Sequence, residues 1–71
     1  MGRRKKEKQI RNILRQRLAM LGKSQSWLAD KTGISINHIN TVINGKWIPT
    51  LTTAMKISEA LVSKVDDLWF Y

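Results

Sequence analysis

The sequence predicts an all-α fold, a compact bundle of five short helices. Apolar residues recur at three- and four-residue steps along most of the chain, which is the spacing of one face of a helix. Glycine followed closely by serine separates these segments at Gly22 and Gly33, and helices commonly end at glycine and begin after serine. Cysteine is absent and 42% of the residues are apolar, so stability must come from packing alone. Seventy-one residues suffice for one such domain.

Residues 1–8 are strongly basic and contain no apolar residue after Met1. We expect a flexible arm here, ahead of a domain that covers residues 9–71. The arm is either a solvated tail or a segment that follows the DNA backbone or enters a minor groove. In the second interpretation the phosphate-binding candidates are Arg3, Arg4, Lys5 and Lys6.

Positive charge is concentrated in the first third of the chain. Nine of the 13 Lys and Arg residues precede Ser26, where Glu7 is the single acidic residue, and the rest of the chain is neutral. The whole net charge of +8 therefore lies in this third. Such asymmetry indicates a polyanionic partner, with nucleic acid first and an anionic membrane surface second.

The first helix is predicted over about residues 7–21 and ends at Gly22. Its spacing defines one face that should pack on a core. The residues of this face are Ile10, Ile13, Leu14, Leu18 and Leu21.

The second and third helices are predicted over about residues 25–32 and 36–44, on either side of Gly33. Ser24 and Ser35 are their expected N-caps. Residues three and four apart share a face, so Ile39, Val42 and Ile43 should point inward. The opposite face is rich in amides, which is either an ordinary polar surface or one that reads base edges. Asparagine can pair with adenine, and threonine or isoleucine can touch a thymine methyl.

The fourth helix is predicted over about residues 51–61, with Thr50 as its cap. Its expected inner face comprises Leu51, Ala54, Met55, Ile57, Ser58 and Leu61.

The sequence from Ser63 to Asp66 resembles a capping box for a short fifth helix. We expect Leu68 and Trp69 to enter the core. Phe70 and Tyr71 are candidates for a homodimer contact.

A series of short motifs extends without a gap from about Ile10 to Trp69. In order, they are Gln25, Leu28-Ala29, Thr32-Gly33-Ile34-Ser35, Ile39, Asn44-Gly45-Lys46, Pro49 and Asp66-Asp67-Leu68-Trp69. This series resembles the Cro and phage-repressor (XRE-type) helix-turn-helix family, whose domain is lambda-repressor-like. Leu18 and Ile43 stand where many relatives pair Arg with Glu, and we expect a packed apolar substitute.

The resemblance implies sequence-specific binding of double-stranded DNA by a bacterial or phage transcriptional regulator, most often a repressor. It implies a homodimer on a partly palindromic site, in the cytoplasm with the nucleoid. Val62 stands where the family commonly has glycine, so the turn there should differ from the family's. The base-reading residues implied are Ile36, Asn37, His38, Asn40 and Thr41. The phosphate-binding residues implied are Gln25, Ser35, Asn44 and Lys46.

Other function classes fit the sequence less well. His38 is the single histidine, so a multi-histidine metal site is excluded, and the chain lacks a glycine-rich phosphate loop. Asp66 and Asp67 are adjacent and do not face one another as an acid and a base. We therefore expect no enzyme, metal or cofactor. The alternatives are an antitoxin or adaptor that uses the same fold to bind protein, and a basic arm that binds membrane.

Overall fold

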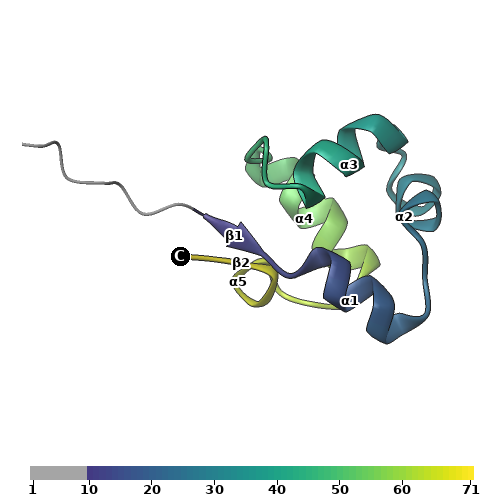
Figure 1. The fold of residues 1–71 in the computed structure, drawn as a ribbon, viewed down its shortest axis with the longest axis horizontal. Helices are drawn as coiled ribbons and strands as arrows, with labels where there is room; N and C mark the ends of the chain where they lie inside the picture. The colour runs from purple at the N-terminus through teal and green to yellow at the C-terminus, as the bar shows by residue number, and fades with distance from the viewer. Residues whose placement is uncertain (1–9) are drawn as a thin grey trace, which may run out of the picture.

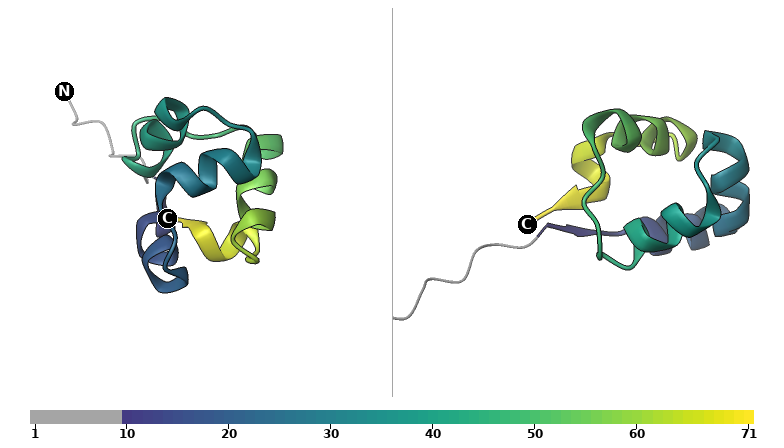
Figure 2. Two further views of the ribbon diagram at one scale, coloured as in Figure 1. Left: turned by 90° about the vertical axis from the view of Figure 1, so that its right-hand side faces the viewer. Right: turned by 90° about the horizontal axis from the view of Figure 1, so that it is seen from above.

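The computed structural model describes residues 10–71, and the predicted arm at residues 1–8, with Arg3, Arg4, Lys5 and Lys6, lies outside this range. Five helices fold around one core, and a two-residue strand lies at each end (Figure 1). Helices α1 and α3 lie on one side and α4 on the other, with α2 joining the two sides at one end (Figure 2). The elements are β1 (Arg11–Asn12), α1 (Leu14–Leu21), α2 (Gln25–Thr32), α3 (Ile36–Ile43), α4 (Leu51–Ala60), α5 (Val65–Leu68) and β2 (Trp69–Phe70).

The predicted helix boundaries between residues 21 and 51 are confirmed. The side-chain oxygens of Ser24, Ser35 and Thr50 each accept a hydrogen bond from the amide three residues further on. These bonds satisfy amides that the first helical turn leaves unpaired. Gly22 and Gly33 end α1 and α2 with φ of 68° and 78°, where a residue with a β-carbon would be strained.

The predicted start of the first helix is wrong, because residues 11 and 12 form a strand. Arg11 pairs with Phe70 and Asn12 with Trp69 in an antiparallel ladder. Helix α1 begins only at Leu14. A pattern of local spacing could not show this, since the strand exists only through a partner nearly 60 residues away.

Asn12 fixes the point where the ladder gives way to α1. Its Oδ1 accepts a hydrogen bond from the amide of Leu14 at 3.0 Å, so the first amide of the helix has a partner. Its Nδ2 donates to the carbonyl oxygen of Val42 at 3.1 Å, in the last turn of α3. One half-buried side chain therefore joins β1, α1 and α3.

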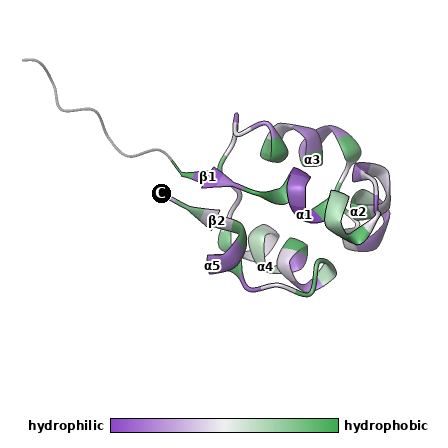
Figure 3. Ribbon diagram, turned by 60° about the horizontal axis from the view of Figure 1, so that its bottom comes forward, coloured by the Kyte–Doolittle hydropathy of each residue, from purple (hydrophilic) through white to green (hydrophobic). Residues whose placement is uncertain are grey.

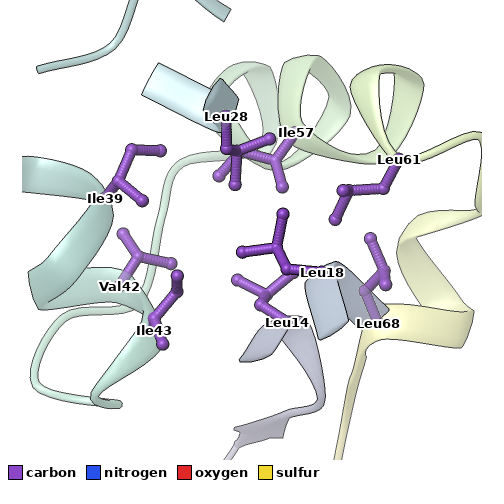
Figure 4. Close-up of a cluster of buried hydrophobic side chains, with 9 residues drawn as sticks. All are labelled: Leu14, Leu18, Leu28, Ile39, Val42, Ile43, Ile57, Leu61 and Leu68. Carbon is purple, nitrogen blue, oxygen red and sulfur yellow. The ribbon is translucent and has the colours of Figure 1, made fainter. Parts of the chain in front are cut away.

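The core contains leucine, isoleucine and valine from all five helices. Leu18 and Ile43 both belong to it, as expected of an apolar pair that replaces an ion pair. Leu21, in contrast, is exposed. The cluster in Figure 4 comprises Leu14, Leu18, Leu28, Ile39, Val42, Ile43, Ile57, Leu61 and Leu68.

The buried face of α4 is narrower than predicted. Leu51 is 70% exposed and Met55 is 50% exposed, so both were wrongly assigned to the inner face. At about 100° per residue, Met55 lies about 110° from the centre of the buried face and Leu51 about 70° from it. Ser58 is buried, and its hydroxyl donates to the carbonyl of Met55 at 2.9 Å. The residues that do face the core are Ala54, Ile57, Ser58 and Leu61.

The turn after α4 keeps the left-handed position although a valine occupies it, so the expected departure from the family is wrong. Val62 has φ of 52°, and its amide and that of Ser63 donate back to the carbonyls of Glu59 and Ser58. These two bonds form the usual glycine-type helix ending. Because the valine side chain is 83% exposed, the strain is confined to its own backbone.

The predicted capping box before α5 does not form. Lys64 is the N-cap residue, and no side chain caps this helix. The hydroxyl of Ser63 instead donates to the carbonyl of Leu61 at 3.2 Å. Leu68 enters the core as predicted, and Trp69 packs against it half-buried.

Candidate nucleic-acid interface

Helices α2 and α3 are joined by a tight turn whose geometry follows from three residues, Thr32, Gly33 and Ser35. The hydroxyl of Thr32 donates to the carbonyl of Leu28 at 2.7 Å, and Gly33 reverses the chain in the left-handed conformation. The backbone then enters α3 at Ser35, whose Oγ accepts from the amide of His38 at 3.2 Å. The turn is therefore held by hydrogen bonds on both sides of the glycine.

Helix α3 has one apolar face and one polar face. Ile39, Val42 and Ile43 are all buried in the core. Residues at about 100° intervals place Asn37 and Thr41 nearly opposite this buried stripe. Hydrophilic and hydrophobic residues accordingly alternate along α3 in Figure 3. The buried stripe fixes the helix to the body, so its polar face has a defined orientation.

Asn37 and Thr41 are exposed at the centre of the outer face. The Thr41 hydroxyl donates to the carbonyl of Asn37 at 2.9 Å, so its hydrogen is used within the helix. The methyl group of Thr41 then remains for contact with a partner. Ile36, at the start of the helix, is 38% exposed and adds a second apolar contact.

His38 and Asn40 occupy the two flanks of this face and are half-buried. The His38 ring meets the Trp47 ring edge-on, with 4.3 Å between their centroids. Trp47 itself packs against the core from the loop after α3. The imidazole is thus supported by a side chain that is fixed in turn. All five predicted base-reading residues therefore lie on α3, with Ile36, Asn37 and Thr41 more accessible than His38 and Asn40.

The predicted phosphate-binding residues lie at helix ends. Gln25 is the first residue of α2 and Ser35 is the N-cap of α3. Asn44 caps the far end of α3, and Lys46 is exposed two residues later. The side chain of Asn44 already has a partner, because Arg15 Nη2 donates to its Oδ1 at 2.9 Å.

The two aromatic residues predicted for a dimer contact lie beside β1. Phe70 is 39% exposed, and the guanidinium of Arg11 lies 5.5 Å from the centroid of its ring. Arg11 also donates to the carbonyl oxygen of Tyr71 at 3.1 Å. Both residues therefore contact their own chain, and their role in a dimer stays a prediction.

Sequence reasoning missed three residues that shape this surface. Arg15 and Asn12 reach the end of α3 from residues 29 and 30 positions away, and Trp47 supports His38 from a loop. Arg15 lies outside the apolar face predicted for the first helix. No spacing rule joins it to Asn44, since the contact depends on how α1 and α3 pack.

Two features of the described residues bear on other functions. Among residues 10–71 no group of three or more His, Asp or Glu side chains is arranged to hold a metal ion. No helix in this range is long and apolar enough to cross a membrane.

Comparison with known proteins gives a consistent result. The Vibrio cholerae cryptic phage CTXphi transcriptional repressor RstR is 30% identical over 83% of this chain, which spans 53% of that protein, about half its length. The uncharacterized HTH-type transcriptional regulator MJ0272 of Methanocaldococcus jannaschii is 32% identical over 87% of this chain and 94% of its own. The crystal structure of a candidate DNA-binding protein from Bacteroides fragilis superposes with a TM-score of 0.77 at 28% identity, over 86% of this chain and 98% of that one. A family model described as helix-turn-helix matches residues 14–68, which is most of the sequence, and the chain therefore belongs to the helix-turn-helix family.

Proposed function

We propose that this protein is a DNA-binding transcription regulator, acting as a repressor, whose helix α3 enters the major groove. The observation that carries the proposal is the exposed ridge of Asn37 and Thr41 on a helix whose other face is locked into the core. A recognition helix needs this combination, because base readout depends on holding a few side chains at fixed positions.

The exposed side chains have the chemistry that base edges require. The side-chain amide of Asn37 can donate a hydrogen bond to N7 of adenine and accept one from the exocyclic N6 amine. Asn40 offers the same donor and acceptor from the flank of the polar face. Ile36 and Thr41 present methyl groups suited to thymine. His38 would contact a base edge with its ring held by Trp47. The phosphate contacts in this proposal are Gln25, Ser35, Asn44 and Lys46, joined by Arg3, Arg4, Lys5 and Lys6 of the arm.

We also propose that two copies bind a partly palindromic site. Two-fold symmetric pairs of helix-turn-helix proteins mirror such sites, with half-sites about one helical turn apart. Phe70 and Tyr71 are the proposed contact between copies. Binding to chromosomal or phage DNA would place the protein in the cytoplasm with the nucleoid. The names of the relatives support regulation of transcription, and no catalytic step or cofactor is part of the proposal.

Selection of bound sequences from a random DNA pool, followed by fluorescence anisotropy, tests this function. Binding through six to ten phosphates should lose roughly 10³–10⁵ in affinity between 50 and 200 mM salt. Replacing Asn37, His38 and Asn40 together by alanine should abolish the preference for the selected sequence over random DNA.

The matched control replaces Thr52 and Lys56, both exposed on α4, by alanine and should keep the preference. Circular dichroism checks that each variant folds. Weak binding to DNA without a salt slope would refute the proposal. Retention of sequence preference by the α3 variant would refute base reading by α3. Capture of a protein partner that survives the α3 substitutions would instead favour the antitoxin or adaptor function.

A further inference from the structure

The end of α3 is connected to α1 by a hydrogen bond between two exposed side chains. Arg15 Nη2 donates to Asn44 Oδ1 at 2.9 Å. An amide oxygen is neutral, so the contact orients the guanidinium without neutralising its charge. A guanidinium has five N–H donors in a rigid plane, and one bond to Asn44 leaves most of them free for an anion.

Arg15 also lies next to the start of α2. A surface hollow of about 240 Å³ is lined by Arg15, Lys23 and Gln25, together with Leu18, Ala19 and Ser24. Arg15 therefore lies between two proposed phosphate-binding residues, Gln25 at the start of α2 and Asn44 at the end of α3. A cation at this position connects the two ends of the helix pair into one basic surface.

We propose that Arg15 binds a backbone phosphate of the duplex and that Asn44 is the positioning residue that aims it. This inference rests on the proposed function and changes the role of Asn44, which the sequence suggested as a phosphate ligand itself. The partner chemistry is a phosphodiester oxygen that flanks the bases read by α3. The charge on Arg15 attracts the phosphate, and the hydrogen bond to the Asn44 amide orients the guanidinium toward it.

The position of the pair gives the phosphate contact a further consequence. Asn44 directly follows Ile43, which is buried in the core, so Arg15 is aimed from the fixed end of the recognition helix. A phosphate bound there sets how far α3 can slide along the groove. The contact should therefore raise the affinity for every sequence while keeping the register of base reading.

A double-mutant cycle with Arg15→Met, Asn44→Ala and the combined variant tests this pair. The control is Lys56→Met, which removes an equal charge from an exposed residue of α4. This helix lies on the opposite side of the fold from α3 (Figure 2). The probe is a labelled random-sequence duplex, with anisotropy titrations between 50 and 200 mM salt. Thermal unfolding confirms that each variant is folded, and the full chain is used throughout.

Arg15→Met should lower the salt slope by about one and weaken binding at least about fivefold, equally for random and selected DNA. Asn44→Ala should weaken binding by about two- to fivefold in the wild-type background and have no effect when Arg15 is already methionine. Lys56→Met should leave the slope within about 0.3 of the wild type.

An unchanged slope for Arg15→Met in a protein that otherwise binds DNA overturns the role of Arg15 and leaves the proposed function standing. Additive losses overturn the positioning role, because Asn44 would then bind its own phosphate. Wild-type protein that fails to bind DNA overturns both. Arg15→Lys tests the charge and the orientation separately. This variant should keep the salt slope, because the charge remains, but its binding should no longer depend on Asn44.

Discussion

The side-chain amide of Asn12 donates a hydrogen bond to the carbonyl oxygen of Val42, at 3.1 Å, and so joins the start of the described fold to the end of α3. The same side chain accepts the amide of Leu14 through its oxygen. Replacing Asn12 by alanine leaves both backbone groups short of a partner in a half-buried site. We expect the free energy of unfolding to fall by about 1–3 kcal/mol, as measured by urea denaturation. Asn37→Ala, an exposed amide on α3, should change it by less than about 0.5 kcal/mol. Equal effects of the two substitutions would show that the Asn12 bonds contribute nothing.

Val62 stores backbone strain that a single substitution can relieve. A valine with φ of 52° is disfavoured, and its exposed side chain makes little contact that would be lost. Val62→Gly should raise the free energy of unfolding by about 1 kcal/mol, after the greater chain entropy of glycine is allowed for. Val62→Ala keeps a β-carbon and should gain less. Thermal or urea unfolding of the wild type and the two variants compares their stabilities. A loss of stability in the glycine variant would contradict the assignment of strain.

The methyl group and the hydroxyl of Thr41 can be tested separately. Because the hydroxyl donates to Asn37 within the helix, Thr41→Val keeps the outward methyl and should bind the selected DNA within about threefold of the wild type. Thr41→Ser removes the methyl and should weaken that binding by about three- to tenfold. Anisotropy on selected and random duplexes measures both. A valine variant that binds worse than the serine variant would mean that the hydroxyl contacts DNA.

The burial of the side chains predicts opposite results for two leucines, Leu18 of α1 and Leu51 of α4. Leu18 is buried in the core, so Leu18→Ala should lower the free energy of unfolding by about 2–5 kcal/mol, which is enough to unfold much of so small a domain. Leu51 is mostly exposed, and Leu51→Ala should change it by less than about 0.5 kcal/mol. Differential scanning calorimetry compares them directly. A large loss of stability in Leu51→Ala would mean that Leu51 packs in the core.

Local chemistry made the middle of the chain predictable. The caps at Ser24, Ser35 and Thr50 and the glycine endings depend on residues within one helical turn, so the sequence alone identified them. The same holds for the two faces of α3, since its buried stripe repeats at helical spacing.

Features that depend on distant partners were beyond such rules. The ladder between Arg11 and Phe70 and the bond from Arg15 to Asn44 each join segments that only the packed fold brings together. Periodicity extended the first helix through residues 11 and 12 because it takes no account of a competing strand. It likewise gave Met55 a place in the core although neighbouring helices cover only a narrow stripe of α4.

The ladder of β1 and β2 also makes the two ends of the described chain neighbours, with Arg11 hydrogen-bonded to Tyr71. A fluorescent dye attached at Tyr71 would therefore lie beside Arg11 of β1. Its emission would give a local signal when a polyanion arrives there, without any label on the surface of α3. Tyr71 thus offers a site for a biosensor that reports on β1.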